Sequence, residues 1–359
     1  MPSASLSLGD IALLRLRNQG LIGRGLATAA EVVGWLGAVQ SQDYAGAKWG
    51  VGQRMRKATD ADVEQAFTAG DILRTHVLRP TWHFVLPRDI RWLLGLTAPR
   101  VIAAMAYYDR KLGLDAPSFA RGHAALERAL AGGKHLTRTE LAAALEAAGL
   151  EASGQRLAHL LMRAELDALI CSAPRRGKQF TYALLEERAA AAPQKTRDEA
   201  LAELTRRYFT SHGPALAQDC AWWSGLTLGD VKRGLSLSAG ALSKIVVDER
   251  DYWYAGELTL PRRTGPLVHL LPNYDEHLIA YKERSAAFDR ERIPKLGSRE
   301  LPLANHLIVL DGRIAGGWRR EGTRPDAPLE LSPIVRLSTV EKKALQAAQE
   351  RLRAFLEPD

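Results

Sequence analysis

The sequence predicts a mainly helical α+β protein in which helices followed by a two-strand hairpin recur three times, ahead of a β-rich C-terminal module. The repeat is visible in three capping boxes, each a Thr-x-x-Glu before an amphipathic stretch, at Thr28, Thr137 and Thr196. After each group of helices come two β-rich runs joined by a turn. At 359 residues the chain is long enough for two or three ordinary domains, so it can accommodate such a repeat.

In the first copy, Thr28 and Glu31 begin a predicted helix. Its apolar residues recur at the spacing of an amphipathic helix, on Val32, Trp35, Leu36 and Val39. A second helix is expected near 60–69, and the runs 72–77 and 81–85 then predict a hairpin.

The second copy is the most regular. Helices are predicted near 119–130, from Thr137 and from Ser153, followed by strands at 169–172 and 179–182. The segment 173–178 between these strands is basic. Three helices and a hairpin with a basic tip form the winged-helix pattern, a variant of the helix-turn-helix.

The third copy is weaker, with a helix from Thr196, two shorter helices, and strands at 243–247 and 252–254 around an acidic tip. Beyond Pro261, short apolar runs alternate with turn residues, and Asp311-Gly312 between two of them is a hairpin signal. The runs are 267–271, 278–281, 307–310 and 313–318. We predict a β-barrel-like module there, followed by a helix that Ser338 and Glu341 begin.

This organisation divides the chain into four predicted segments. They are 1–112 for the first winged-helix copy, 113–192 for the second, 193–260 for the third, and 261–359 for the β-barrel-like module with its terminal helix. A barrel or sheet after tandem helical domains keeps the whole protein in the α+β class.

The charge of the chain favours a polyanionic partner. The net charge is +8 and the sequence pI is near 9.5, which indicates nucleic acid ahead of a membrane surface. A merely soluble basic protein is the alternative interpretation. Basic side chains cluster on the third helix and hairpin of copy two, and the candidate DNA contacts are Arg156, His159, Arg163, Arg175, Arg176, Lys178 and Arg319.

Composition also limits other classes of protein. Only two cysteines occur, Cys171 and Cys220, without CxxC spacing, which argues against a zinc site or a secreted disulfide scaffold; we expect no metal and no cofactor. The N-terminal 1–9 lacks a basic stretch followed by an apolar core, so no signal peptide is predicted. The most apolar stretch, 90–108, is interrupted by charges and a proline and is not a membrane span. We expect a cytoplasmic, nucleoid-associated monomer.

Two glutamines flank one small residue in the segment 38–44, as Gln40-Ser41-Gln42. Glutamine does not change charge near neutral pH, so the pair suits a reaction whose leaving group needs no proton but whose water must be held. On an extended backbone, residues two apart point to the same side, and both amides could face one ligand. On a continuing helix they would diverge. A polar helix end that bonds its own backbone is the alternative.

Other polar residues are candidates to line the same site. They are Asp43, Tyr44, Arg79, Thr81, His83, Tyr274, Asp275 and Glu276. Each group has a structural alternative: Asp43 caps the next helix, 79–83 is part of a structural hairpin, and 274–276 ties the C-terminal module to the helical part.

Four segments carry a resemblance to a known family. They are LGAVQSQDYAGAKWGVGQR at 36–54, LRPTWHFV at 78–85, LLPNYDEHLIAYKER at 270–284 and DGRIAGGWRR at 311–320. The chain resembles the winged-helix DNA glycosylases of the azinomycin-resistance (AlkZ-like) type, a family that also has a YcaQ-like branch. The resemblance implies three tandem winged-helix units around a concave DNA-binding surface, closed by a C-terminal β-barrel.

The resemblance also assigns a catalytic element. The family's Gln-x-Gln or Gln-x-Asp motif falls on Gln40 and Gln42, which makes the chain similar to the Gln-x-Gln branch, associated with self-resistance to bulky guanine alkylators. Ser41 stands where that branch usually has an aliphatic residue. The implied partner is double-stranded DNA that carries alkylated purines.

We therefore expect a monofunctional DNA glycosylase that removes N7- or N3-alkylated purines, including bulky adducts or interstrand crosslinks. The lysine nearest the motif is Lys48, so Schiff-base lyase chemistry is not expected. The alternative from another class is a winged-helix transcription regulator without catalytic activity, which would bind one operator sequence and would not need the glutamine pair.

Overall fold

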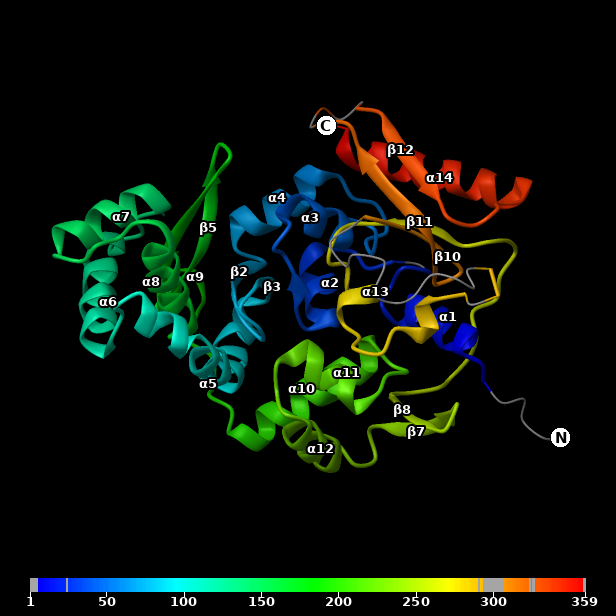
Figure 1. Cartoon of the computed structure of the whole chain (residues 1–359), viewed down its shortest axis with the longest axis horizontal. Helices are drawn as coiled ribbons and strands as arrows, with labels where there is room; N and C mark the ends of the chain where they lie inside the picture. The colour runs from blue at the N-terminus through cyan, green and yellow to red at the C-terminus, as the bar shows by residue number, and fades with distance from the viewer. Residues whose placement is uncertain are drawn as a thin grey trace. The chain divides into compact units, whose positions relative to one another are not determined.

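The computed structural model describes residues 6–23, 25–289, 291–292, 306–322, 324 and 327–357, so part of the N-terminal 1–9 lies outside the described residues. Helices and strands are mixed, with helix the commoner, as the sequence predicts. The chain forms two compact units (Figure 1). Unit 1 consists of residues 1–64, 201–223 and 227–359, and unit 2 of residues 65–200 and 224–226. The division into four segments stays a prediction.

Unit 2 contains the second predicted copy in the expected order of three helices and a hairpin, with a short strand, which was not expected, between the first two helices. Its elements are α6 (Ala116–Leu130), β4 (Leu136–Thr137), α7 (Arg138–Ala147), α8 (Gly154–Leu166), β5 (Ile170–Arg176) and β6 (Gln179–Leu184). The capping box of Thr137 and Glu140 is formed at the start of α7. Leucines of the three helices, among them Leu126, Leu141 and Leu160, share one core with Ile170. The count of three winged-helix copies stays a prediction.

The β5–β6 hairpin is longer than the sequence indicates. Arg176 pairs with Gln179, so only Gly177 and Lys178 remain at the tip. Gly177 has a φ of 62°, a left-handed conformation that glycine adopts without strain. The hairpin extends past the helices of its own unit (Figure 1).

The first and second hairpins of unit 2 share a sheet, which the sequence did not indicate. Strands β2 (Leu73–His76) and β3 (Trp82–Val85) follow α4 (Asp60–Ala69) and form the predicted first hairpin. Arg74 of β2 pairs with Ser172 of β5, and the order within the unit is β3-β2-β5-β6-β4. The unit also contains α5 (Pro87–Lys111) and α9 (Leu185–Arg188).

The N-terminal part of unit 1 corrects one sequence expectation. It contains α1 (Leu8–Asn18), α2 (Ala29–Leu36), β1 (Val39–Gln40) and α3 (Tyr44–Gly52). Helix α2 ends earlier than its apolar pattern suggests, because Gly37 follows it with a φ of 84°. Val39 therefore lies in a strand, and Trp35 is 42% exposed, with its indole N–H donating to the Asn18 carbonyl at 2.6 Å.

The third group of helices is followed by a tighter hairpin than predicted. The helices are α10 (Arg197–Ser211), α11 (Ala217–Ser224) and α12 (Leu228–Leu237). Strand β7 (Ser243–Val247) pairs with β8 (Arg250–Tyr254) through a turn whose central residues, Asp248 and Glu249, have φ values of 47° and 60°. Positive φ at both centres is the type I′ geometry, which leaves two residues in the turn instead of the expected four.

The C-terminal part of unit 1 is an open sheet in its described residues, not the predicted barrel-like closure. Strands β9 (Val268–Leu271), β10 (Leu307–Leu310), β11 (Arg313–Arg320) and β12 (Leu329–Pro333) lie in the order β12-β11-β10-β9. The β10–β11 hairpin turns at Asp311-Gly312 as predicted. Helix α14 (Thr339–Leu356) begins with the predicted capping box of Ser338 and Glu341 and contacts β9.

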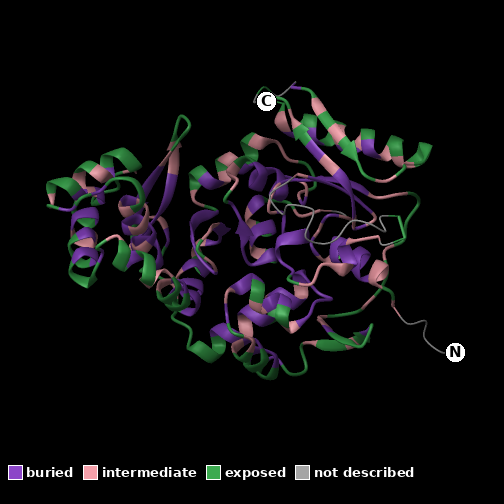
Figure 2. Cartoon of the chain, viewed as in Figure 1, coloured by how far each residue is buried: buried purple, intermediate pink, exposed green. Residues whose placement is uncertain are grey.

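The apolar run at 278–281 is not a strand. The Asp275 side chain accepts a hydrogen bond from the His277 N–H at 2.9 Å and begins the short helix α13 (Glu276–Ile279). A 3-10 turn, η1 (Ser285–Ala287), follows. All four residues of α13 are buried (Figure 2), so their apolar pattern does not distinguish a strand from a helix.

A buried ion pair joins the turn after α3 to the N-cap residue of α13. The Arg54 guanidinium, 1% exposed, binds Asp275 through two hydrogen bonds of 2.8 Å. Its other three N–H groups donate to the Gly50 carbonyl and to the backbone and side-chain oxygens of Gln19, so all five donors are used. Burial disfavours the charged form of both groups, but the attraction and hydrogen bonds between them are stronger than this effect. The pKa of Arg54 is therefore raised and the pKa of Asp275 is lowered.

Replacing Arg54 by Met should leave the Asp275 carboxylate buried without its cation. We expect the free energy of unfolding to fall by about 3–5 kcal/mol, because an unpaired buried charge is strongly unfavourable. Urea denaturation of the full chain measures this loss. The double variant Arg54→Met/Asp275→Leu should lose clearly less than the sum of the single variants. Additive losses would show that the pair is not coupled.

Two histidines of unit 1 are buried in their neutral form. Burial, reinforced by the Arg351 charge, lowers the pKa of His269 on β9 to about 3. Burial likewise lowers the pKa of His277 to about 4, although its Nε2–H donates to the Gly312 carbonyl at 2.9 Å. In an unfolded chain these groups titrate near pH 6.5, so below that pH the unfolded state binds protons that the folded state does not.

Stability should therefore fall as the pH drops from about 6.5 toward 3. At pH 5 the contribution of His269 to this loss is about 2 kcal/mol, from 1.5 pH units at 1.36 kcal/mol each. His269→Leu should make the fall in unfolding free energy between pH 7 and pH 5 shallower by about that amount. Urea titrations at both pH values measure it. The control is the half-buried His135→Leu, which should change the fall by less, because burial lowers the pKa of His135 less strongly than that of His269. Equal slopes in wild type and His269→Leu would contradict the assignment.

Candidate functional site

Gln40 ends β1 inside unit 1, and its residue is 5% exposed. Its backbone N–H donates to Oε1 of Glu276 at 2.8 Å. The helix before it has already ended at Leu36, so the glutamine motif does not lie on a helix. The side chains of Gln40 and Gln42 are therefore not forced apart by helical geometry. The polar helix end considered above is therefore not what the chain forms here.

Glu276 connects three segments of unit 1 that are far apart in sequence. Its Oε2 accepts from the Trp223 indole N–H at 2.9 Å and lies 3.5 Å from Nε2 of His212. The His212 ring stacks on Tyr208 at 4.9 Å between centroids, and the His212 carbonyl accepts from the Tyr281 hydroxyl at 2.7 Å. A carboxylate with this many partners fixes the backbone of Gln40 relative to α11 and α13.

The motif becomes exposed at its last residue, after the chain leaves the strand. Ser41 is fully buried, whereas Gln42 lies in a bend and is exposed. Asp43 is the N-cap of α3, where its carboxylate accepts from the Gly46 N–H at 3.1 Å. Tyr44 is the first residue of α3 and is half-buried. Both glutamines were expected on an extended backbone. Gln40 lies in strand β1, whereas Gln42 lies in the bend after it.

Two glycines of α3 let the segment around Asp275 approach the helix. A Cβ on Gly46 would lie 2.6 Å from the Asp43 carboxylate and 3.1 Å from Pro272, and one on Gly50 would lie 3.3 Å from Asp275. Gly46 and Gly50 are spaced i, i+4 and so lie on one face of α3, and Arg54 comes four residues later, in the turn after the helix. This spacing is the signal that could have revealed Arg54, which sequence reasoning did not select.

The structure brings Asp275 and Glu276 together with Gln40 in unit 1. Tyr274, the third candidate of that segment, has a φ of 59° and is half-buried. Sequence reasoning also missed Gln19, His212 and Trp223. Gln19 directly follows α1, His212 directly follows α10, and Trp223 lies in α11, so each is a single residue without a local signal.

The predicted residues of the first hairpin belong to unit 2. Arg79 and Thr81 lie in the turn between β2 and β3, after Leu78 with a φ of 64°. His83 is fully buried in β3, and its Nδ1 lies 2.9 Å from the Thr81 carbonyl. This hydrogen bond within the hairpin supports the structural role considered for His83.

The candidate DNA contacts lie in three places: on α8, on the β5–β6 hairpin and on β11. On α8, Arg156 donates to the Glu151 carbonyl at 3.2 Å, His159 bonds Asp109 at 2.6 Å, and Arg163 bonds Asp167 at 2.7 Å. These three side chains thus have partners within unit 2. On the hairpin, Lys178 is exposed at the tip and Arg176 is exposed beside Glu140, with Arg175 half-buried before them. Arg319 on β11 of unit 1 is exposed and pairs with Glu330.

Within the described ranges, no three or more His, Cys, Asp or Glu side chains gather as a metal ion would require. In the same ranges, none of the helices combines the length and apolar character needed to cross a membrane.

Comparisons with known proteins identify the family of the chain. The family model of the AlkZ-like DNA glycosylases matches residues 33–355. A relative in Streptomyces sahachiroi, the interstrand DNA cross-link repair glycosylase, is 24% identical over 93% of this chain and 94% of its own length. The solved structure of the DNA glycosylase AlkZ from the same organism covers 98% of this chain and 97% of its own, with a TM-score of 0.80 and 22% identity, and so shares the fold. A transcription regulator is not favoured. The chain belongs to the AlkZ-like DNA glycosylase family, enzymes that act on N-glycosyl bonds of DNA.

Proposed function

We propose that the chain is a monofunctional glycosylase for N7- or N3-alkylated purines in double-stranded DNA, including bulky adducts and interstrand crosslinks. The observation that carries the proposal is the fixed Gln40, whose backbone is held by Glu276 next to the exposed Gln42. The name of the Streptomyces sahachiroi relative, an interstrand cross-link repair glycosylase, supports the crosslink part of the proposal.

The chemistry suits neutral amides. A purine alkylated at N7 or N3 is cationic and leaves without a proton, so the enzyme has to orient a water and stabilise an oxocarbenium-like sugar. One glutamine carbonyl accepts from the water while the other amide orients it or contacts the sugar. Because neither amide titrates near neutral pH, the chemical step should be insensitive to pH from about 6 to 8.

Glu276 contributes as a positioning residue in this proposal. It is 1% exposed and binds the Gln40 backbone, so it sets where the amide lies without touching the DNA. The surrounding Trp223 and Arg54–Asp275 contacts keep its helix in place. A rigid backbone is what water positioning requires, since small displacements lower the rate steeply.

The contacts of Lys48 support a reaction without a Schiff-base lyase step. Its Nζ lies 2.6 Å from Asp60 and 2.7 Å from Glu64. The Lys48 residue is buried and held by two carboxylates of α4, so it serves in an ion-pair cluster between α3 and α4 and is not presented to a sugar. Hydrolysis by water is then the only route to base release that the motif offers.

Gln40→Ala and Gln42→Ala should each lower the single-turnover rate of 7-methylguanine release about 100-fold or more, because either change leaves the water unoriented. DNA affinity should remain near that of the wild type. Release of the free base from methylated duplex DNA measures the rate, and gel shift measures the affinity.

Gln346→Ala on the exposed face of α14 is the matched control and should retain the full rate. Uracil in DNA carries no positive charge before it leaves, so the wild type should not release it. Full activity in either motif variant, or efficient release of uracil, would refute the glutamine mechanism.

The β5–β6 hairpin supplies a second test of the proposal, through DNA binding. Changing Arg175, Arg176 and Lys178 together to Ala should weaken binding to all duplexes alike, because phosphate contacts carry no sequence information. The slope of log K against log salt concentration should fall in magnitude by about 0.9 for each phosphate that the hairpin no longer neutralises. Fluorescence anisotropy at several salt concentrations measures both quantities.

A triple variant that removes the same charge from α14, Lys342→Ala/Lys343→Ala/Arg353→Ala, is the control. These three residues are exposed. An unchanged slope in the hairpin variant would remove the hairpin from the DNA interface. An equal fall in both variants would mean that only net charge matters.

A further inference from the structure

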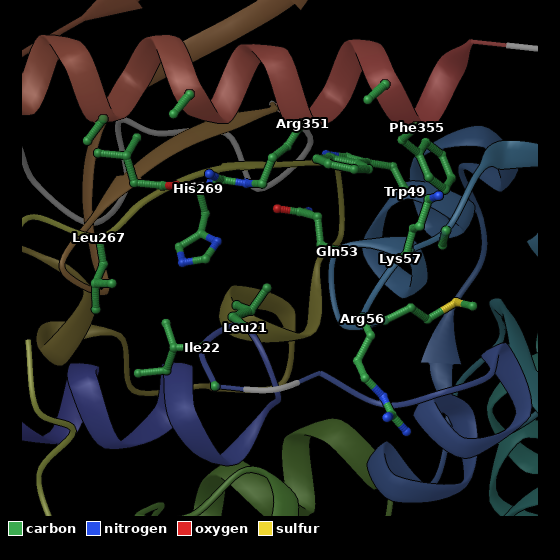
Figure 3. Close-up of a pocket in the computed structure, with 18 of the residues that line it drawn as sticks. Leu21, Ile22, Trp49, Gln53, Arg56, Lys57, Leu267, His269, Arg351 and Phe355 are labelled. Atoms are coloured by element: carbon green, nitrogen blue, oxygen red, sulfur yellow. Dashed lines mark hydrogen bonds between the residues drawn. The ribbon is translucent and has the colours of Figure 1, made fainter.

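A pocket in unit 1 is not used by the proposed reaction. The end of α3, strand β9 and helix α14 enclose a cavity of about 620 Å³ (Figure 3). Neither Gln40 nor Gln42 lines it. Its volume is within the range of small-molecule sites, about 300–1,000 Å³. The cavity is therefore large enough for a small organic ligand, and its lining residues do not include the glutamine motif.

One wall of the pocket is aromatic. Trp49 of α3 and Phe355 of α14 lie side by side, with ring centroids 5.1 Å apart and planes at 50° (Figure 3). The Trp49 indole N–H is fixed by the Leu270 carbonyl at 2.7 Å. Leu21 and Leu267 add apolar surface, and alanines of α14 keep that side open. A flat, apolar group could rest against this wall.

Two buried polar atoms in the pocket have no partner among the described residues. They are Nε2 of His269, whose residue is 8% exposed, and Nε2 of Gln53. Both side chains extend toward the middle of the pocket from different elements (Figure 3). Buried polar groups are nearly always hydrogen-bonded, so two such atoms on side chains that line one cavity indicate a ligand with polar edges.

The charges around the pocket all have one sign. Arg56, Lys57 and Arg351 line it, and none of its described lining residues is Asp or Glu. Arg351 is oriented by a hydrogen bond to the Val268 carbonyl at 2.7 Å, while Arg56 and Lys57 are exposed. Three cations without a carboxylate favour an anionic group on the ligand.

We propose that this pocket binds a nucleotide unit, with the base against Trp49 and Phe355, base edges bonded to His269 and Gln53, and the phosphate near Arg56, Lys57 and Arg351. Aromatic stacking next to cations is the usual way in which proteins hold unpaired nucleotides. Burial keeps His269 neutral, so one ring nitrogen can accept and the other donate. The site goes beyond base excision and does not depend on it.

Isothermal titration of the full chain with dGMP tests the proposal. We expect saturable binding with Kd below about 1 mM, and binding of deoxyguanosine or inorganic phosphate alone at least about tenfold weaker. Arg56→Ala/Lys57→Ala should weaken dGMP about tenfold, whereas Lys342→Ala/Lys343→Ala on the exposed face of α14 removes the same charge and should not.

Gln53→Leu keeps the side chain's size, removes its amide, and should weaken dGMP about fivefold without changing inorganic phosphate binding. Competition with a single-stranded oligonucleotide identifies the source of the nucleotide. If the oligonucleotide displaces bound dGMP, the ligand is part of a DNA strand; if it does not, the ligand is a free nucleotide. No saturable dGMP binding, or equal affinity in wild type and Arg56→Ala/Lys57→Ala, would overturn the proposal.

Discussion

The buried pair of Arg54 and Asp275 is the constraint on which the candidate site depends. Asp275 has two tasks, because the same carboxylate binds the guanidinium and begins α13. The next residue, Glu276, reaches Gln40, Trp223 and His212 only if that helix begins where it does. A charge pair of this kind adds little stability over an apolar core, but it tolerates only one arrangement of its partners. Its contribution here is the position of the glutamine strand.

Local signals in the sequence predicted much of the helical framework. The capping boxes at Thr137 and Ser338 and the hairpin at Asp311-Gly312 are formed as expected, because each depends on residues within a few positions of one another. Apolar periodicity was less reliable. It extended α2 past Leu36, although Gly37 ends the helix, and it could not distinguish a strand from the buried helix α13.

Tertiary pairings were the part that the sequence could not supply. The shared sheet of the two hairpins in unit 2 depends on a single pairing of Arg74 with Ser172, and nothing in either strand indicates it. The open C-terminal sheet and the partners of Glu276 are of the same kind. Gln40 and Gln42 were selected because of their chemistry, whereas the residues that hold Gln40 are ordinary in type and distant in sequence.

The separation of Arg54 from Asp275 by 221 residues has a consequence for the synthesis of the protein. At the usual 5–20 residues per second, roughly 10–40 seconds pass between the appearance of the cation and that of its carboxylate on the ribosome. During that time α3 can form as a helix, but Arg54 after it lacks its partner Asp275, and Gly46 and Gly50 lack the segment that packs against them. The glutamine strand is therefore ordered late, after the segments 201–223 and 227–359 have emerged, and a chain truncated before α13 would contain the motif without the framework that positions it.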